Sequence, residues 1–302
     1  MARKKKGRPI SGWLVLDKPY DFGSTQAVGK VKWLFQAQKA GHAGTLDPLA
    51  SGMLPIALGD ATKTVNHVMD GFKTYRFTVR WGVETSTDDA EGEVVNQSDV
   101  RPTRQQIEAA LAPFIGDILQ TPPQFSAVKI NGQRAYDLAR AGEDVKPKER
   151  EVTVDELIIL DTSDADHTAF EMVCSKGTYV RSLARDLGRA LGTFGSVAAL
   201  RRTAVEPFDE NDLVPLEALI DLEGDLDALD DHLIPLDRAL DHLTGFEVSA
   251  DDARRIRLGN AVLLRGRDVP ITEEEVTATH KGQVIALGTI ELGRFQPRRL
   301  LG

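Results

Sequence analysis

Apolar and polar residues alternate over residues 74–83. Aromatic and β-branched side chains occupy every second position, and threonine or arginine fill most positions between them. This period of two predicts a half-buried strand whose buried face carries Tyr75, Phe77, Val79, Trp81 and Val83. The apolar run 12–17 leads into Lys18-Pro19, which predicts a buried strand that ends in a turn. Two later runs, 152–160 and 169–174, are also typical of strands.

Other stretches have the apolar spacing of helices. Behind Ser24 or Thr25, either of which could cap a helix, the i, i+3, i+4 pattern comprises Ala27, Val28, Val31, Leu34 and Phe35. Thr103 with Gln106 makes a capping box for another helix, and residues 178–191 predict a third. From about Phe246 the chain changes to short strands at 261–264, 284–287 and 289–292. Helices and strands without regular βαβ alternation predict an α+β fold with a mostly antiparallel sheet.

Composition excludes several classes of protein. A chain of 302 residues has room for one sizeable domain and a small one. It lacks a run of ~18 apolar residues and an apolar stretch behind its basic N-terminus, so we expect neither a membrane span nor a secretory signal. The single cysteine, Cys174, fits a small core residue in a reducing cytoplasm. The histidines and this cysteine lack the spacings of zinc sites, so we expect no metal.

The net charge of −9 at first argues against a nucleic-acid partner. Residues 206–252, however, hold 16 of the 46 acidic residues and one basic residue, Arg238. The rest of the chain carries 36 basic and 30 acidic residues. Because binding depends on the local field, this segregation leaves room for a basic surface that faces RNA. The acidic segment itself is interpreted as a solvated face.

Residues 40–52 form a glycine-rich loop with one carboxylate, Asp47. Its three glycines permit unusual backbone angles and close approach to a ligand, and Pro48 disfavours helix at Asp47. Composition alone favours an ordinary turn in which Asp47 accepts a local hydrogen bond. A triphosphate-binding loop is excluded because Gly52 is followed by Met53 and Leu54 rather than by lysine and a hydroxyl residue.

The loop lies within GHAGTLDPLASGMLPIALGDATK, which resembles the catalytic motif of the TruB-type tRNA pseudouridine synthases. Five further segments between residues 12 and 205 match that family in its order: GWLVLDKP, KTYRFTVRWGVETSTDDAEGEVV, TPPQFSAVKINGQRAYDLARAGE, CSKGTYVRSLARDLGRALG and LRRTAV. Ala43 and Thr45 depart from the usual motif, and the match weakens beyond Pro207. The resemblance implies that the protein isomerises one uridine of tRNA, position 55 in the T-arm, to pseudouridine without a cofactor.

The resemblance also implies a domain organisation. A basic disordered arm would occupy residues 1–10, and a pseudouridine-synthase catalytic domain, with a mixed, mostly antiparallel sheet flanked by helices, residues 11–245. Within it, residues 121–151 resemble a mobile RNA-clamping insertion, with a strand at 125–130, a turn at Asn131-Gly132 and a helix at 135–141. Residues 246–302 would form a small β-rich, PUA-like RNA-binding domain. The basic residues assigned to RNA are Lys129, Arg134, Arg140, Lys146, Lys148 and Arg150 in the insertion, and Arg254, Arg255, Arg257, Arg265, Arg267, Arg298 and Arg299 in the C-terminal part.

Three residues take catalytic roles by this resemblance. Asp47 is the catalytic carboxylate, as a nucleophile at C1′ or C6 or as a base toward the sugar. Arg181 pairs with Asp47 and holds it ionised, although the same residue alone would suit an exposed first helical turn. Tyr75 stacks on the flipped uracil and assists proton removal at C5, whereas its strand position alone predicts an ordinary core tyrosine.

Four more residues are assigned to substrate binding by the same resemblance. They are His42, which fills the space left by the flipped base, Tyr179 as a pocket wall, Leu200 as an apolar contact to the uracil, and Lys18 as a support of the site. Without the resemblance, His42 reads as a loop histidine and Leu200 as a core residue.

Two alternative functions stay open at this point. One is the guide-RNA-dependent branch of the same superfamily, which generally lacks the insertion. The other is a non-catalytic protein that binds or folds RNA, for which Asp47, Tyr75 and Arg181 would be unnecessary. A glycosidase would need a second placed carboxylate, which no pattern nominates. The favoured reading is a cytoplasmic, monomeric enzyme that acts on tRNA without an obligate protein partner.

Overall fold

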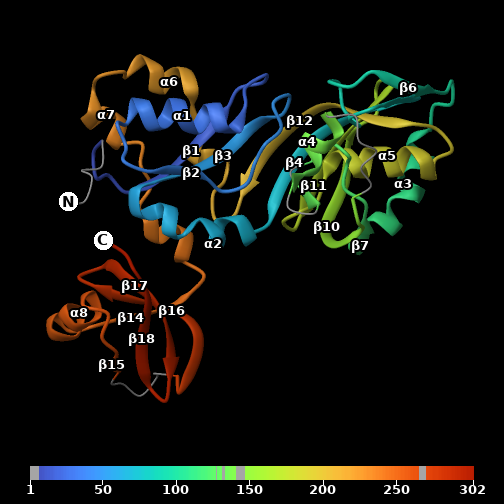
Figure 1. Ribbon diagram of the computed structural model, residues 1–302. Helices are drawn as coiled ribbons and strands as arrows, with labels where there is room; N and C mark the ends of the chain where they lie inside the picture. Colours follow the sequence, from blue (N-terminus) through green and yellow to red (C-terminus); the bar gives the residue numbers. More distant parts are fainter. Residues whose placement is uncertain (1–6, 127, 131–132, 141–146, 265–269) are drawn as a thin grey trace.

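The computed structural model describes residues 7–126, 128–130, 133–140, 147–264 and 270–302 (Figure 1). These residues form two large sheets, drawn one above the other in Figure 1, and two small two-stranded sheets. The predicted turn at Asn131-Gly132, the end of the helix predicted at 135–141, and three of the assigned basic residues, Lys146, Arg265 and Arg267, lie outside the described residues.

The larger sheet has nine strands among the described residues. Their order is β13 (Val214–Pro215), β1 (Gly12–Lys18), β3 (Ser51–Leu58), β12 (Gly195–Val205), β4 (Lys73–Trp81), β11 (His167–Cys174), β10 (Arg150–Asp161) and β7 (Gly116–Gln120), and β2 (Ala40–His42) pairs with β3. The β1–β13 and β3–β12 pairs are parallel and the others antiparallel. This mixed, mostly antiparallel sheet confirms the predicted fold class.

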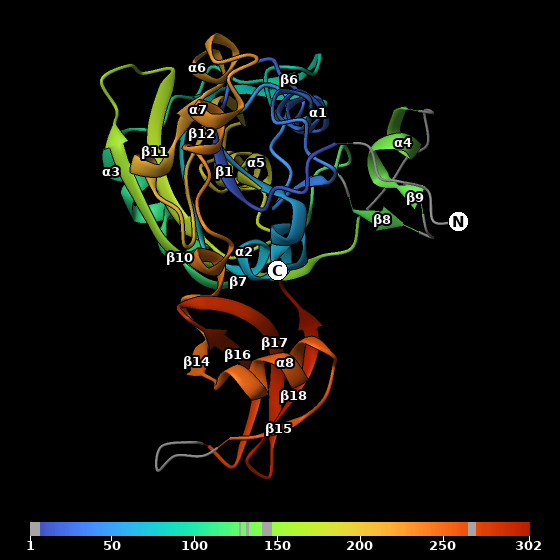
Figure 2. The same cartoon turned by 90° about the vertical axis from the view of Figure 1, so that its left-hand side faces the viewer.

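Helices cover the sheet in two groups (Figures 1 and 2). The helix α1 (Ser24–Leu34), with α6 (Leu216–Asp221) and α7 (Leu226–Asp230), packs on the half that contains β1 and β3. The helices α5 (Val180–Ala190) and α3 (Arg104–Ala110) pack on β4, β10 and β11. A third apolar cluster includes Val68 of α2 (Val65–Asp70) and lies on β1 and β3 from the opposite side. Tyr75 and Leu200 contact both of the first two clusters, so the central strands β4 and β12 join them.

Several predicted elements are confirmed and others were missed. The strand over 74–83 ends at Trp81, Cys174 is buried in β11, and the Thr103–Gln106 capping box is present. The prediction that Ser24 or Thr25 caps α1 is wrong, because Gly23 is the N-cap and the Ser24 hydroxyl bonds elsewhere. The predictions at 284–287 and 289–292 belong to one strand, β17. The missed elements include β7, β12, α6, α7 and α8 (Ala250–Arg257).

The smaller sheet belongs to the C-terminal part of the chain. Its order is β14 (Thr244–Glu247), β16 (Thr272–His280), β17 (Gln283–Glu291), β18 (Arg294–Leu300) and β15 (Val262–Leu263). It meets the first sheet's domain through an apolar cluster of Leu240, Leu287 and Leu301, and the Lys63 ammonium donates to the Leu300 carbonyl at 2.8 Å. This part of the chain is β-rich as predicted, and its assignment as a PUA-like module stays a prediction.

The remaining elements are short. Strands β5 (Val83–Thr85) and β6 (Val94–Gln97) form a hairpin, and β8 (Lys129–Ile130), β9 (Gln133–Arg134) and α4 (Ala135–Arg140) lie in the insertion. Within the predicted N-terminal arm, Arg8 makes two bonds of 2.6 Å to the Asp230 carboxylate of α7. Among the described residues, every helix is too short or too polar to cross a lipid bilayer.

Candidate active site

The loop that carries Asp47 connects β2 to β3. Gly44 and Gly52 have φ angles of +96°, which favour glycine. A Cβ on Gly52 would lie 2.3 Å from the carbonyl oxygen of Arg202, so β12 approaches the loop more closely than a larger residue permits. The Ala50 amide donates to the Asp47 carbonyl at 3.1 Å, and the Asp47 side chain is 39% exposed. The loop therefore presents one accessible carboxylate on a tightly packed backbone.

Two side chains from the first strand and helix hold the residues on either side of Asp47. The Ser24 hydroxyl donates to the Leu46 carbonyl at 2.7 Å and accepts from the Leu46 amide at 2.9 Å. The fully buried Lys18 ammonium donates to the carbonyls of Pro19, Phe22 and Pro48. Burial lowers the pKa of Lys18 to about 8, and the nearby Asp47 carboxylate opposes that shift. Lys18 thus fixes the backbone beside Asp47 rather than the carboxylate itself.

A buried arginine holds both ends of the same loop. Arg202 of β12 is 2% exposed, and its guanidinium donates to the carbonyls of Met53 at 2.8 Å, Gly44 at 3.2 Å and Thr45 at 3.4 Å. Hydrogen bonds from a charged donor are stronger than neutral ones. Three of them from one side chain fix the course of the loop before and after Asp47.

Arg181, in the first turn of α5, faces Asp47 from the other side. Its side chain is 7% exposed, and its Nη2 atom lies 2.9 Å from the Asp47 carboxylate. The same atom donates to the Phe125 carbonyl at 3.1 Å, while Nη1 donates to the Thr87 carbonyl at 3.2 Å and lies 3.5 Å from Asp89. The predicted ion pair is therefore present, across 134 residues of sequence. An ion pair of this kind orients a carboxylate and stabilises its charge.

Two further arginines extend this arrangement along α5. Arg181, Arg185 and Arg189 are four residues apart and share one face of the helix. Arg185 pairs with Asp88 at 3.0 Å and Arg189 pairs with Glu84, so α5 is tied to the chain that follows β4. Burial raises the pKa of Asp88 to about 6, and the charge of Arg185 opposes that shift.

A small pocket lies between the loop and α5. Its walls include the facing side chains of Asp47, Asp89 and Arg181, and it is lined by Leu49, Ala50, Ala90, Val197, Ala198, Ala199 and Leu200 as well. Two carboxylates, the arginine that pairs with both and the predicted apolar contact Leu200 thus share one concave site. Such a site suits an apolar ring held beside a charged group.

Three other assigned residues are not among the residues that line this pocket. Tyr75 of β4 is cross-strand partner to Arg202, and burial raises its pKa, which the Arg202 charge opposes. The imidazole of His42 has its pKa lowered, first by burial and then by Arg202, and its buried Nδ1 has no hydrogen-bond partner among the described residues. Tyr179 is the N-cap of α5, with the Arg150 guanidinium 6.0 Å from its ring centre.

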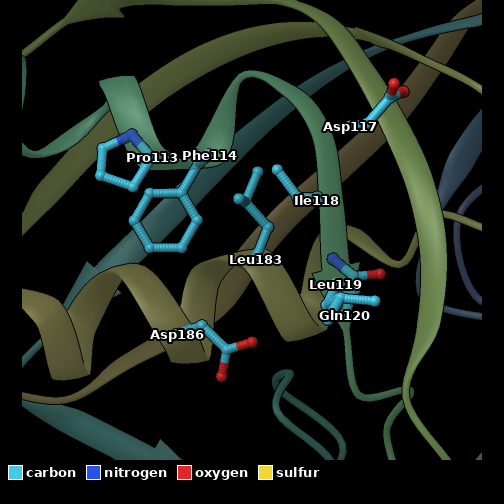
Figure 3. Close-up of a pocket in the computed structure, with 8 residues that line it drawn as sticks. All are labelled: Pro113, Phe114, Asp117, Ile118, Leu119, Gln120, Leu183 and Asp186. Carbon is cyan, nitrogen blue, oxygen red and sulfur yellow. The ribbon is translucent and has the colours of Figure 1, made fainter.

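A second, larger pocket lies between β7 and α5 (Figure 3). Phe114, Ile118 and Leu183 line it, and Asp117 and Asp186 stand at its edges. Asp117 accepts from Thr153 and Asp186 pairs with Arg185, so both carboxylates already have partners. Within the described ranges, no group of three or more His, Cys, Asp or Glu side chains is placed to hold a metal ion.

Comparisons with known proteins give the family. Residues 32–180 match the model of the TruB family pseudouridylate synthase (N terminal domain), and residues 181–241 match the tRNA pseudouridylate synthase B C-terminal domain. The chain is 59% identical to "tRNA pseudouridine synthase B" of Agrobacterium fabrum, over 99% of this chain and 97% of the relative. This chain belongs to the TruB family of pseudouridylate synthases.

Two further similarities support membership of the TruB family. A relative of the same name from Brucella ovis is 56% identical over 99% of both chains. A crystal structure of a Cbf5–Nop10–Gar1 complex contains a chain that is 25% identical, with a TM-score of 0.72, over 96% of this chain and 84% of that one. This chain therefore shares its fold with a protein whose crystal structure was determined in a complex with other proteins.

Sequence reasoning missed two residues that hold this TruB-family site. Asp89, the second carboxylate on Arg181, lies in the quoted segment KTYRFTVRWGVETSTDDAEGEVV, and Arg202 lies in LRRTAV. The available signals were a charge within the strand-like segment of Arg202 and, for Asp89, one of two adjacent acidic residues in a polar segment. Neither residue has a spacing that separates it from surface charges such as Arg201, which is 35% exposed.

Proposed function

We propose that this protein isomerises one uridine of tRNA, position 55 in the T-arm, to pseudouridine, with Asp47 as the catalytic carboxylate. The observation that carries the proposal is the 2.9 Å ion pair between Asp47 and Arg181 at the wall of a small pocket. The full-length similarity to enzymes named for tRNA supports the substrate class.

The reaction needs one reactive acid, and of the two carboxylates in the pocket Asp47 is the more exposed, at 39% against 12% for Asp89. The bond from C1′ to N1 breaks, the free base rotates, and a bond from C1′ to C5 forms. C5 then loses a proton to a base and N1 gains one from solvent, so the two proton transfers balance. No electron is transferred and no group leaves the substrate, so the chemistry needs no cofactor. One ionised carboxylate can act as nucleophile or as base in such a sequence.

The target uridine must leave its stack to reach Asp47, because a stacked base in an RNA loop is inaccessible. In this proposal Tyr75 stacks on the flipped uracil and assists removal of the C5 proton, while Leu200 and Tyr179 bound the base. His42 contacts the RNA where the base has left, and its lowered pKa keeps the imidazole neutral near pH 7. Lys18 acts through the backbone carbonyl of Pro48.

The proposal includes how the enzyme works in the cell. It acts on free tRNA in the cytoplasm, as a monomer, without a guide RNA or an obligate protein partner. The high identity to tRNA pseudouridine synthase B along nearly the whole chain favours this over the guide-RNA-dependent branch. The ion-paired carboxylate favours an enzyme over a protein that only binds RNA.

The test compares the protein with its Asp47→Asn variant on an unmodified tRNA transcript, without cofactor or partner. We expect the unaltered protein to form pseudouridine at position 55 and the variant to form none, because Asn keeps the shape of Asp but not its charge. Pseudouridine mapping measures the product. Filter binding measures the affinity, which should change less than about threefold since only one side chain is exchanged and its shape is kept.

Asp166→Asn is the matched control. Asp166 is an exposed carboxylate that pairs with Arg101, so we expect full turnover from this variant. Turnover by folded Asp47→Asn protein would remove Asp47 from its catalytic role, and product at another uridine would reject the T-arm assignment.

A further inference from the structure

The last residue of β7 and the first residue of the insertion are bonded to the start of α5. Gln120, which is 2% exposed, donates from its amide nitrogen to the Tyr179 carbonyl at 3.1 Å and accepts from the Tyr179 amide at 2.7 Å. The next carbonyl, Thr121, accepts from the Ser182 hydroxyl at 2.7 Å and from Arg185 at 3.0 Å. We call residues 120–126 the junction. Four bonds thus attach its first two residues to one helix.

The junction also contacts the arginine that faces Asp47. Nη2 of Arg181 carries two protons, and it lies 2.9 Å from the Asp47 carboxylate and 3.1 Å from the Phe125 carbonyl. Nη1 is directed at Thr87 and Asp89. Each terminal nitrogen of the guanidinium therefore has two acceptors, one for each of its protons. A shift of Phe125 would leave Nη2 with one acceptor, so the position of the junction bears on the geometry of the ion pair.

The other end of the junction contacts the rest of the insertion. The Tyr136 amide of α4 donates to the Ser126 carbonyl at 3.0 Å, and the Ala135 amide donates to the Val128 carbonyl at 2.7 Å. The rings of Phe125 and Tyr136 meet edge to face, with centres 6.2 Å apart. Figure 2 shows α4 with β8 and β9 standing out from the two large sheets. A continuous series of contacts therefore runs from α4 through Phe125 and Arg181 to Asp47.

We infer that the junction positions Arg181, so that an RNA docked against the insertion favours the arrangement in which Arg181 is paired with Asp47. The inference rests on the proposed function, since it concerns how that site is made ready for the substrate. Thermodynamically, the RNA need only bind better when the junction is in place than when it is displaced. Ser182 and Gln120 are then positioning residues that act through Arg181 and touch no substrate.

The experiment measures the single-turnover rate and the tRNA dissociation constant for Ser182→Ala. Ser182 is fully buried and its hydroxyl holds Thr121, so alanine releases the junction without changing a charge. We expect the rate at saturating tRNA to fall about tenfold, as couplings between contacting residues have this size, and the dissociation constant to rise by a smaller factor, because part of the binding free energy then restores the junction. Thr193→Val is the matched control, because its buried hydroxyl donates to the Val100 carbonyl at 3.0 Å at the other end of α5. It should leave both quantities unchanged.

A double-mutant cycle with Arg181→Lys separates positioning from general packing. Lysine cannot bond to Phe125 and Asp47 through the fork of a guanidinium, so Ser182→Ala should slow the Arg181→Lys enzyme by less than about twofold. Equal slowing in both backgrounds, or none in either, would overturn the inference. Gln120→Met provides a second release of the junction if Ser182→Ala does not fold, with the same expectation. Normal turnover by Arg181→Lys would instead count against the proposed role of Arg181.

Discussion

Buried cations hold both sides of the Asp47–Arg181 pair, but they bond to different partners. On the loop side, Lys18 and Arg202 donate to the neutral carbonyls of the loop and of the turn after β1. On the α5 side, Arg181 and Arg185 pair with the carboxylates of Asp47, Asp89 and Asp88. The cations on the loop side bond to backbone carbonyls, whereas those on the α5 side bond to carboxylates as well as to backbone carbonyls.

The difference follows from what each segment offers. A loop with three glycines has few side chains that can accept hydrogen bonds, so its carbonyl oxygens are the available acceptors. A cation bonded to carbonyls fixes the loop and leaves the Asp47 charge for the substrate. Along α5, the carboxylates neutralise arginines that are up to nine-tenths buried, since an unpaired buried charge is costly.

The largest expected effect on stability comes from replacing Arg202, the arginine on the loop side. Arg202→Met keeps much of the side-chain volume but leaves the Met53, Gly44 and Thr45 carbonyls without their donor. We expect the free energy of unfolding in urea to fall by about 3–5 kcal/mol, and the folded fraction to turn over slowly.

The neighbouring arginine on the same strand is the control for that change. Arg201 is 35% exposed and pairs with Asp17, so Arg201→Met should cost less than about 1 kcal/mol. If Arg202→Met is as stable as the unaltered protein, the desolvation of the guanidinium outweighs its bonds, and the loop is held by something else.

The importance of Arg202 also marks a limit of prediction from sequence. The strand β12 that carries it has irregular pairing between Val197 and Ala199 and between Arg202 and Ala204. Each irregularity changes which face a side chain occupies, so the alternation that revealed β4 is lost in β12. In β17, Gly288 suggested a break between two strands. It is instead a point of close approach, where a Cβ would lie 2.3 Å from the Gln296 carbonyl.

The sequence predicted only those site residues that lie in segments resembling the family's motifs. The resemblance nominated Asp47 and Arg181, and the structure places them in one ion pair. The contacts of Ser24, Gln120 and Arg202 are bonds to backbone atoms of distant segments. Every residue type has a backbone carbonyl, so a bond to a carbonyl does not constrain which residue accepts it. Such a contact therefore leaves no sequence pattern in the accepting segment.

The α5 side should respond to pH in a way that the loop side does not over the same range. Burial raises the pKa of Asp88 from its ordinary 3.8 to about 6, so between these values the folded protein keeps a proton that the unfolded chain has lost. The contribution of Asp88 to stability therefore falls as pH rises from about 4 to 6. Asp88→Asn cannot titrate, and we expect it to remove up to about 3 kcal/mol of this change in urea unfolding. Parallel curves for the two proteins would show that Asp88 is ionised throughout.

The smallest expected effect comes from removing the Ser24 hydroxyl, an uncharged group that bonds to the loop. Ser24→Ala removes the hydroxyl that bonds to both the amide and the carbonyl of Leu46, and should cost about 1–2 kcal/mol. Because a hydroxyl does not titrate, the loss should be the same in urea unfolding at pH 5 and at pH 7. Thr25→Ala is the control, since Thr25 is exposed and the cap of α1 is Gly23. An equal loss from Thr25→Ala would mean that Ser24 stabilises the start of the helix rather than the residue beside Asp47.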